Sequence, residues 1–368
     1  MTITIRAAVA REPGAPLTIE NLSMEAPRAD EIRVRVVAVG VCHTDLVVRD
    51  GEIPVPFPVV LGHEGAGIVE EVGSAVTKVA PGDHVVMTFN ACGACPTCRE
   101  HATSYCHESF PRNFGAARPD GSSPLSGEGE QVHGYFFGQS SFATHAICRE
   151  INVVKVPDDV PLELLGPLAC GVQTGAGAVM NSFKVGANKT FAVFGAGSVG
   201  LSALMAAKVV CAAKIIAVDT NDERLAVARE LGATNVVNPK TEDPVAAIMA
   251  ATGYGVDYAL DTTGIEAVIL AALDSLAPRG TAGILGASAR DSVIPLKQGL
   301  LRGGGRRIMG IIEGDSDPDI FIPLMIELYR QGRFPFDKLI RFYRFDEINE
   351  AIRDSATGRT IKPVLQMA

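Results

Sequence analysis

A glycine-rich turn at residues 194–200, with the sequence FGAGSVG, is the feature that most constrains how this chain can fold. A predicted strand precedes it and a predicted helix follows it, which is the context that the pattern G-x-G-x-x-G requires. Gly195 allows the tight bend, Gly197 lets the backbone approach a pyrophosphate, and Gly200 lets the helix lie close to the strand. The amide groups left to face the anion include those of Ser198 and Val199. The turn therefore predicts a dinucleotide site.

An acidic residue at the end of the next apolar run makes this prediction more specific. Residues 214–218 read as a buried strand, and Asp219 follows them directly. A carboxylate at this place bonds both ribose hydroxyls of NAD and repels the additional phosphate of NADP. The alternative is a glycine-rich buried turn with an ordinary capping aspartate, but the combined pattern favours an NAD site.

From about residue 172 the chain alternates between apolar runs and helical segments. The runs predicted as buried strands are 191–194, 214–218, 256–260 and 281–285. The clearest helix is 221–231, because Asn221 can cap its start and Gly232 can close its end. The residues that share one face of this helix are Leu225, Ala228 and Leu231. This alternation predicts an α/β domain with a parallel, doubly wound sheet.

The first third of the chain consists of short strands and turns. Residues 32–39 begin with the alternation of a half-buried strand, and the turn 81–83 leads into the apolar run 84–87. After about residue 312 the α/β rhythm ends, and the last segment is predicted to pack back on the first domain. The length of 368 residues suggests two domains. We expect one domain from 1–171 with 313–368 and another from 172–312.

Charge and hydropathy exclude several classes of protein. A formal net charge of −9 without a local basic patch argues against a nucleic-acid partner. The uncharged stretches 164–183 and 190–207 approach the length of a membrane helix, but Pro167 and the glycines exclude that assignment. We therefore expect no membrane partner. The first residues lack the pattern of a secretory signal, so we expect a cytoplasmic protein.

A cluster of four cysteines lies between residues 92 and 106. In a reducing compartment four thiolates in a short loop satisfy tetrahedral zinc, whereas adjacent disulfides would be strained and quickly reduced. No open position is implied, so the site is predicted to be structural. A zinc ribbon that binds nucleic acid is the alternative, but Arg99, His101 and Arg112 are too few for a basic surface. The four predicted ligands are Cys92, Cys95, Cys98 and Cys106.

Taken together, the motifs resemble those of the zinc-dependent medium-chain alcohol dehydrogenases. The resemblance runs through nearly the whole chain and rests on GVCHTD at 40–45, GHEGAG at 62–67, the cysteine lobe 92–106, CGVQTGAG at 170–177, and FGAGSVG with Asp219. It implies a GroES-like, β-rich catalytic domain beside a Rossmann domain. The stretches LGPLACGVQTGAGAV, FFGQSSFATHA and EGDSDPDIFIP are similar to those of bacterial aryl-alcohol (benzyl alcohol) dehydrogenases and of geraniol dehydrogenases.

By spacing alone neither Cys42 nor His63 is diagnostic, but the resemblance assigns them a second zinc. It implies that Cys42, His63 and Cys170 bind a catalytic zinc and leave its fourth position to water or the alcohol. It also implies that Asp45 orients His63 and that Glu64 helps to exchange the zinc-bound species. The hydroxyl that starts the proton relay would be that of Thr44. Two zinc ions per chain are therefore expected.

The same resemblance implies further contacts with the cofactor. Thr174 would contact the nicotinamide, Arg224 would flank the adenosine ribose, and Lys362 would lie near the pyrophosphate. Two positions depart from the family pattern. Val47 replaces the histidine that often ends the proton relay, and His43 stands where relatives often have an arginine that contacts the pyrophosphate. We favour phosphate contact for His43 and keep proton transfer as the alternative.

The activity implied by the resemblance is reversible, NAD-dependent oxidation of a primary alcohol to its aldehyde. The zinc would lower the pKa of the alcohol so that a zinc-bound alkoxide forms, and a hydride would then pass to the nicotinamide. Aromatic side chains at Phe89, Phe136 and Phe137 fall where relatives line the substrate pocket, which suits a flat benzylic or allylic alcohol. Plain core packing is the alternative for these three residues.

Other functions remain open at this point. An allylic terpene alcohol of the geraniol type is the main alternative substrate. A glutathione-linked formaldehyde dehydrogenase shares the scaffold, but no clear pattern for anchoring that thiol is present. A structural or purely NAD-binding member of the superfamily is the non-catalytic alternative, and the intact set of zinc ligands argues against it. We expect a homodimer or homotetramer.

Overall fold

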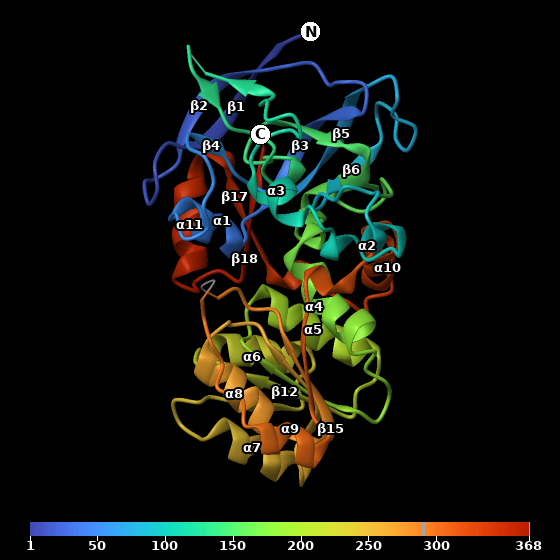
Figure 1. Ribbon diagram of the computed structural model, residues 1–368, viewed down its shortest axis with the longest axis vertical. Coiled ribbons are helices and arrows are strands. Elements are labelled where there is room, and N and C mark those ends of the chain that lie inside the picture. The colour runs from blue at the N-terminus through green and yellow to red at the C-terminus, as the bar shows by residue number, and fades with distance from the viewer. Residues whose placement is uncertain (128, 289–290, 368) are drawn as a thin grey trace. The chain divides into compact units, whose positions relative to one another are not determined.

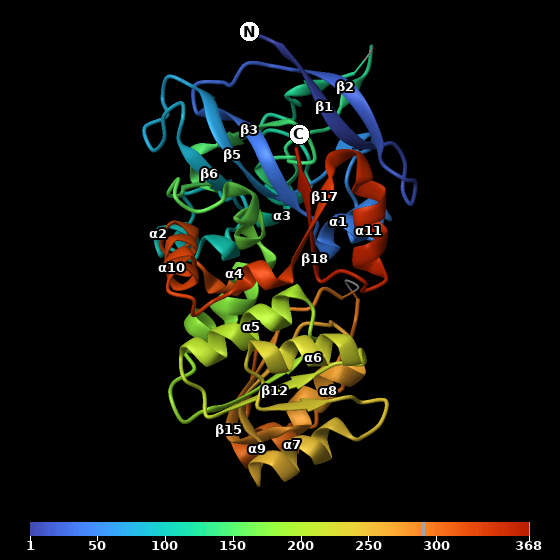
Figure 2. The same cartoon turned by 180° about the vertical axis from the view of Figure 1, so that it is seen from behind.

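The computed structural model describes residues 1–127, 129–288 and 291–367. The chain forms two compact units, which Figures 1 and 2 show from opposite sides. The first unit comprises Met1–Cys170, Asp317–Pro323 and Asp337–Ala368, and the second comprises Gly171–Ser316 and Leu324–Phe336.

A six-stranded parallel sheet forms the centre of the second unit. Its strand order is β13-β12-β11-β14-β15-β16, and each neighbouring pair is parallel. The chain enters at β11 and winds outward first to one side and then to the other, which confirms the doubly wound sheet predicted from the sequence. The strands are β11 (Thr190–Phe194), β12 (Lys214–Val218), β13 (Asn235–Val237), β14 (Val256–Asp261), β15 (Leu276–Ile284) and β16 (Arg307–Gly310).

Helices connect these strands and cover the sheet. Helices α5 and α6 pack against each other, and so do α7 and α8. Because parallel crossovers are right-handed, connections that wind in opposite directions place their helices on opposite faces. The helices of this unit are α4 (Gly171–Gly177), α5 (Ser198–Val209), α6 (Asp222–Leu231), α7 (Pro244–Thr252), α8 (Glu266–Asp274) and α9 (Gln298–Gly304).

Helix α6 follows the sequence prediction closely. The side chain of Asn221 accepts hydrogen bonds from the amides of Glu223 and Arg224, so it caps two of the free N–H groups at the helix start. Gly232 ends the helix with a φ of 123°. The buried residues are those predicted to share one face, namely Leu225, Ala228 and Leu231.

Two sheets build the first unit. The first is antiparallel, with strand order β4-β1-β2-β7-β8. The second has the order β10-β6-β5-β3-β18-β17, with β9 also pairing with β3. Apolar residues of both sheets, such as Val9, Val34 and Leu365, share one core. The strands are β1 (Ile3–Ala10), β2 (Thr18–Met24), β3 (Glu31–Gly40), β4 (Val59–Val60), β5 (Glu64–Val72), β6 (His84–Met87), β7 (Leu125–Ser126), β8 (Gln131–Val132), β9 (His145–Arg149), β10 (Val153–Lys155), β17 (Ile340–Arg344) and β18 (Lys362–Gln366).

The register of the second sheet determines which loops meet at its edge. Gly40 at the end of β3 pairs with Glu64 at the start of β5, and Gly65 pairs with Met87 at the end of β6. On the other side Val364 of β18 pairs with Gly40. β18, in the last part of the chain, therefore packs on the first unit. The remaining helices are α1 (His43–Arg49), α2 (Pro96–Arg99), α3 (Ser109–Phe114), α10 (Pro318–Arg330) and α11 (Ile348–Ala356).

The division of the chain differs from the expected one in several places. The sequence assigns 1–171 and 313–368 to the first domain, but the structure groups Gly171, residues 313–316 and the segment Leu324–Phe336 with the second unit. One contact that holds the segment there is a hydrogen bond from the Arg333 guanidinium to the carbonyl of Val209, 3.1 Å long, at the end of α5. Such a contact between distant parts of the chain is not visible in a local sequence pattern.

The two apolar stretches of the sequence do not form long helices. Residues 190–207 divide into β11 and the start of α5, and residues 164–183 divide into short helical turns around α4. Within the described parts of the chain, no helix combines the length and apolar character needed to cross a bilayer.

Candidate functional site

Four side chains that can bind a metal meet at the edge of the sheet where β3 ends and β5 begins. The ligand atoms of Cys42, His63, Glu64 and Cys170 all lie within 4.8 Å of one another. Cys42 caps the start of α1, and His63 directly precedes β5. The turn before Cys170 packs so closely on β5 that a Cβ atom added at Gly166 would lie 2.4 Å from the Glu64 carbonyl oxygen. The structure thus assembles the three ligands expected from the resemblance.

Asp45 organises two of these ligands. Its Oδ1 accepts hydrogen bonds from His63 Nδ1 at 2.9 Å and from the Gly62 amide at 3.1 Å. Its Oδ2 accepts a hydrogen bond from the Cys42 amide at 3.0 Å. A ring that donates through Nδ1 presents Nε2 as its ligand atom. That Nε2 atom is buried and has no hydrogen-bond partner among the residues that the structure describes.

The donor set fits zinc. Two thiols and an imidazole are ligands that zinc prefers, and three protein ligands with a further position open is the arrangement of a catalytic zinc site. The buried, unpartnered His63 Nε2 supplies the independent observation, because a buried polar atom without a partner costs free energy unless something binds it. Cys42, His63 and Cys170 could therefore hold the ion.

The charges around the site favour a deprotonated ligand. The pKa of Cys42 lies well below its usual value because Cys170 donates a hydrogen bond to it and because His63 and Lys362 are positively charged nearby. Burial lowers the pKa of His63, but the negative charges of Asp45 and Cys42 outweigh burial and raise it overall. Because a metal ligand must be deprotonated, binding of zinc would release protons from this group.

Glu64 has a partner that the sequence did not reveal. The ammonium group of Lys362 lies 2.8 and 2.9 Å from the two carboxylate oxygens of Glu64 and also donates to the Val41 carbonyl oxygen at 3.2 Å. Burial raises the pKa of Glu64, and the charge of Lys362 limits the rise. Burial lowers the pKa of Lys362, but the charge of Glu64 raises it overall. Lys362, expected near a pyrophosphate, is therefore placed in a buried ion pair beside the metal ligands.

Three positions that bear on the expected proton relay lie on α1: Thr44, which would start it, His43, its alternative proton carrier, and Val47, where the usual histidine is missing. The Sγ of Cys42 lies 3.8 Å from the hydroxyl oxygen of Thr44, which places that hydroxyl at the metal ligands. The side chain of His43 is exposed, and that of Val47 is half-buried.

The three phenylalanines expected in the pocket are all buried in the core of the first unit. The ring of Phe137 stacks on His63 with 4.4 Å between the ring centres, and Phe136 meets the same ring edge-on at 5.7 Å. Phe89 is 6% exposed. Phe136 and Phe137 therefore pack directly against a metal ligand, where they exclude water from one side of its ring.

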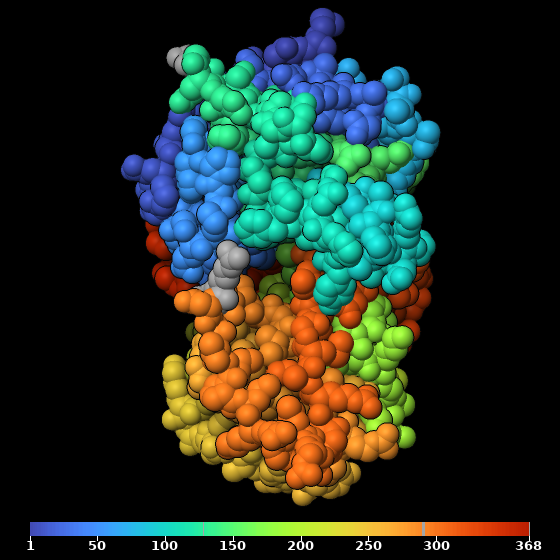
Figure 3. Space-filling model, in the orientation of Figure 1, coloured from blue at the N-terminus to red at the C-terminus, as the bar shows by residue number. Residues whose placement is uncertain are grey.

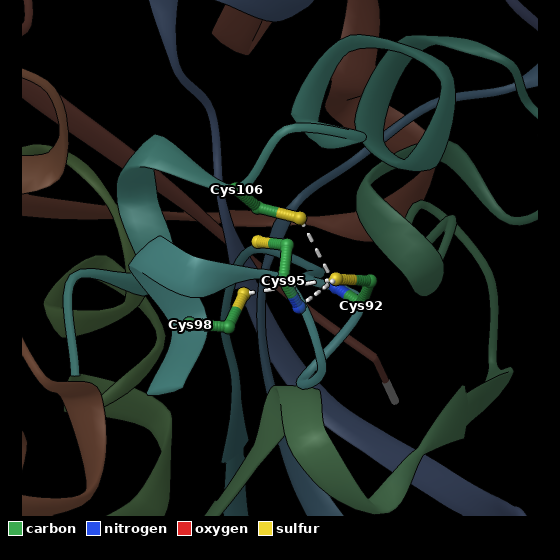
Figure 4. Close-up of side chains that lie close together, drawn as sticks. All are labelled: Cys92, Cys95, Cys98 and Cys106. Atoms are coloured by element: carbon green, nitrogen blue, oxygen red, sulfur yellow. Dashed lines mark hydrogen bonds between the residues drawn. The ribbon is translucent and has the colours of Figure 1, made fainter. Parts of the chain in front are cut away.

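The cysteine lobe forms a second, separate group. The Sγ atoms of Cys92, Cys95, Cys98 and Cys106 lie within 4.8 Å of one another, and Figure 4 shows the four side chains gathered together. Backbone amides point at these sulfurs: Cys95 donates to Cys92 Sγ at 3.3 Å, and Glu108 donates to Cys106 Sγ at 3.4 Å. Such N–H···S contacts favour thiolates. The lobe lies at the surface of the first unit, where Figure 1 labels α2 and Figure 3 shows the atoms.

The lobe geometry fits a closed zinc site. Hydrogen bonds, the one with Thr97 first among them, lower the pKa of Cys95 to about 5. The structure records all four cysteines as free thiols rather than as disulfides. Four sulfurs satisfy tetrahedral zinc completely and leave no position for a substrate. This group could therefore hold a structural ion.

In the second unit the glycine-rich turn lies at the switch point between β11 and β14. Gly195 has a φ of 100°, and a Cβ atom added to it would lie 2.3 Å from the Thr262 hydroxyl oxygen. A Cβ atom on Gly200 would lie 1.8 Å from the Gly195 carbonyl oxygen, so only glycine allows α5 this close to the strand. A Cβ atom on Gly197 would meet nothing within 4 Å. Ser198 and Val199 open α5, so their amides have no partner within the helix.

Asp219 connects the turn with the next strand. Its Oδ2 accepts a hydrogen bond of 2.6 Å from the Ala196 amide, and its Oδ1 accepts one of 2.8 Å from the Asn221 amide. Arg224 follows in the first turn of α6, and its buried Nε atom has no hydrogen-bond partner within the described residues. The structure therefore brings the expected cofactor residues of this unit to the carboxyl edge of the sheet, where dinucleotides bind in doubly wound folds.

The structure adds Glu313 to this region. Its Oε2 lies 3.3 Å from the Thr174 hydroxyl and 3.3 Å from the Gln173 amide nitrogen. Glu313, Gly314 and Asp315 all have positive φ values, of 51°, 65° and 49°. Only Gly314 signals such a turn in the sequence, so the acidic neighbour of Thr174 could not be found without the fold.

Comparisons with known proteins identify the family. Residues 28–158 match the alcohol dehydrogenase GroES-like domain, and residues 198–329 match the zinc-binding dehydrogenase model. The chain is 51% identical over 365 residues to a geraniol dehydrogenase of Castellaniella defragrans, a match that covers 99% of this chain and 98% of that protein. The chain belongs to the zinc-dependent alcohol dehydrogenase family, as the sequence motifs predicted.

Two solved structures are similar to this protein over their whole length. The structure matches benzyl alcohol dehydrogenase from Acinetobacter calcoaceticus with a TM-score of 0.97 and 49% identity, over 100% of both chains. It matches an alcohol dehydrogenase zinc-binding domain protein from Burkholderia ambifaria with a TM-score of 0.99 and 52% identity, also over 100% of both chains. The protein is therefore a zinc-dependent alcohol dehydrogenase that is similar to enzymes named for benzyl alcohol and for geraniol.

Proposed function

We propose that this enzyme uses NAD to oxidise a primary aromatic alcohol to its aldehyde, reversibly. The observation that carries the proposal is the group formed by Cys42, His63 and Cys170, in which the ligand atom His63 Nε2 is buried without a partner. The 49% identity to the benzyl alcohol dehydrogenase from Acinetobacter calcoaceticus supports an aromatic substrate. An allylic terpene alcohol is the second candidate, because the geraniol dehydrogenase is 51% identical.

The residues of the chain have distinct roles in this proposal. Bound zinc would supply a Lewis acid for the alcohol oxygen, and bound NAD would supply the hydride acceptor. Asp45 keeps the proton of His63 on Nδ1 and so fixes which nitrogen binds the metal. The hydroxyl oxygen of Thr44 accepts the proton from the alcohol and passes it outward. Glu64, paired with Lys362, balances charge beside the ligands and assists exchange at the open position.

A comparison of substrates tests the proposed function. Formation of NADH is followed by absorbance with benzyl alcohol, geraniol, ethanol and S-hydroxymethylglutathione as alternative substrates. We expect the highest kcat/KM with benzyl alcohol. A higher kcat/KM with geraniol would assign the enzyme to terpene alcohols, and the highest value with S-hydroxymethylglutathione would make it a formaldehyde dehydrogenase. No turnover of any alcohol by protein with two zinc ions would refute the activity.

Asp219 is expected to determine the choice between NAD and NADP. In Asp219→Gly the ratio of kcat/KM for NAD to that for NADP should fall by about 10-fold or more, because like charges ~4 Å apart repel by roughly 1 to 4 kcal/mol. Asp222→Asn is the matched control, because it removes a nearby charge and keeps an oxygen for the Asn238 side chain. Similar kcat/KM values for both cofactors in the unmodified enzyme would contradict the assignment.

His43 is expected to bind the cofactor phosphate rather than to carry the proton. His43→Arg should then retain turnover and bind NAD more tightly, whereas His43→Gln should bind NAD more weakly without slower proton release. Equilibrium titration with NAD and stopped-flow measurement of proton release test these two outcomes separately. General-base catalysis contributes ~10²–10⁴-fold, so proton release slowed by that amount in His43→Gln would place the imidazole in the proton pathway.

The cellular form of the enzyme follows from the same proposal. We propose that the enzyme is cytoplasmic, because both cysteine groups need reduced thiols. We also propose that it is a homodimer or homotetramer. Light scattering on the purified enzyme measures the subunit number. A monomer at micromolar concentration would contradict this part of the proposal.

A further inference from the structure

A buried glutamine, Gln139, makes hydrogen bonds with both strands that end at the metal ligands. It is 1% exposed. Its Nε2 lies 3.0 Å from the carbonyl oxygens of His63 and Met87 and 3.2 Å from that of Thr88. Its Oε1 accepts a hydrogen bond of 3.2 Å from the Gly65 amide. One side chain thus connects the start of β5 with the end of β6.

These bonds lie where the strand ladder stops. Gly65 and Met87 are the last paired residues of β5 and β6 toward the site, so the ladder between these two strands ends before His63 and Thr88. The Thr88 amide instead donates to the Asn152 carbonyl oxygen at 2.9 Å. The carboxamide of Gln139 has donors and an acceptor and bonds both strands at this point. The placement of the His63 backbone relative to Thr88 is therefore held by a side chain from a third segment, shortly after η2 (Phe136–Gly138).

Thr88 continues the connection to another metal ligand. Its hydroxyl donates a hydrogen bond of 2.8 Å to the carbonyl oxygen of Ala169, the residue before Cys170. Thr88 is fully buried. A continuous path of hydrogen bonds therefore runs from the His63 carbonyl through Gln139 to the backbone of Thr88, and from the Thr88 hydroxyl to the residue before Cys170.

We propose that Gln139 and Thr88 form a brace that sets the distance between the metal ligands His63 and Cys170. Both are positioning residues, because they act through the backbone of the ligands. The inference rests on the proposed metal site. Substitution of a residue that hydrogen-bonds to a metal ligand typically lowers the metal affinity by about 10- to 100-fold. The brace should therefore slow the loss of the catalytic zinc and leave the zinc of the cysteine lobe unaffected.

Thr88→Val tests the brace with the least disturbance, since valine keeps the shape of threonine and removes only the hydroxyl. The loss of each zinc from the purified holoenzyme to a chromophoric chelator is followed over time. In Thr88→Val we expect one of the two zinc ions to be released faster than the other. The release rate of this ion should be about 10-fold higher than in the unmodified enzyme. Thr88→Ser, which keeps the hydroxyl, should restore slow release.

Two further variants separate positioning from general stability. Thr252→Val is the matched control, because its hydroxyl also bonds a backbone carbonyl, that of Ile248, at 2.7 Å but in the second unit. It should leave both release rates unchanged. Gln139→Leu should accelerate release of the same zinc ion as Thr88→Val does. The double variant should release this ion little faster than either single variant, because each substitution interrupts the same path of hydrogen bonds. Cobalt that replaces the catalytic zinc should have an absorption band in Thr88→Val and in Gln139→Leu that is shifted from its position in the unmodified enzyme.

The outcomes distinguish the brace from the function on which it rests. Two zinc ions with unchanged release in Thr88→Val and Gln139→Leu would refute the brace alone. Equal acceleration of both zinc ions would also refute it, since that indicates general destabilisation. A single zinc per chain in the unmodified enzyme, bound only by the cysteine lobe, would refute the proposed metal site itself.

Discussion

Replacement of Cys170 by serine is expected to abolish turnover while the fold and NAD binding persist. The hydroxyl of serine is a poorer zinc ligand than a thiolate, so the site formed with Cys42 and His63 should lose its ion. Loss of a Lewis acid removes several kcal/mol of stabilisation from the transition state, which corresponds to a fall in kcat of about 10³-fold or more. Metal analysis should find one zinc per chain instead of two, and circular dichroism should be unchanged.

The chain offers a matched control for this experiment. Cys211 is exposed and belongs to neither metal group, so Cys211→Ser makes the same chemical change elsewhere. It should keep both zinc ions and full activity. Full activity in Cys170→Ser, or an unchanged zinc content, would show that this cysteine is not a ligand of the catalytic ion.

Replacement of Cys98 by serine should have the opposite profile, with stability as the primary loss. Binding of a structural zinc contributes on the order of 10 kcal/mol to folding in small zinc modules, and the lobe has little apolar core of its own. Besides its cysteines that core contains Ala91 and Ile151. The lobe should therefore unfold locally in Cys98→Ser, and limited proteolysis should cut between residues 92 and 106 long before the rest of the chain.

Protease resistance of the lobe equal to that of Cys211→Ser would contradict this prediction, as would retention of both zinc ions. Treatment of the unmodified enzyme with a strong chelator provides a second measurement. It should expose the same cleavage sites, because removal of the metal and removal of one ligand have the same physical effect.

The Rossmann unit could be predicted well because its signals are local. The predicted strand 214–218 coincides with β12, and the predicted helix 221–231 has its cap and its buried face where expected. Strands buried on both faces read as continuous apolar runs, and a capped amphipathic helix carries its own boundaries.

The boundary of β15 shows where this reasoning fails. The prediction began the strand at 281, whereas β15 begins at Leu276. The missed residues include Pro278, Arg279 with a φ of 67°, and Gly280, which read as a turn. The pairing with β14 shifts its register between Val256 and Tyr258, so the sheet accommodates this irregular stretch by an interruption of the ladder.

The ligands of the catalytic metal site, unlike those of the cysteine lobe, could be named from the sequence only through the resemblance. Cys42, His63 and Cys170 lie far apart in the chain, and the sheet register that joins them is not written in their local patterns. Gln139 and Lys362 were harder still. A glutamine is an ordinary polar residue until its partners are known, and the ion pair between Lys362 and Glu64 forms only because β18 lies beside β3.

That placement of β18 has a consequence for the order in which the protein is made. β18 is synthesised long after β3, yet the two strands pair, and β18 carries the lysine that neutralises Glu64 from 298 residues further along the chain. Until that stretch has been translated, the first unit lacks this strand, and Glu64 lacks its counter-charge. Contacts between residues so distant in sequence form slowly because the long loop between them must close. The first unit, together with its metal site, can therefore be completed only after β18 has left the ribosome.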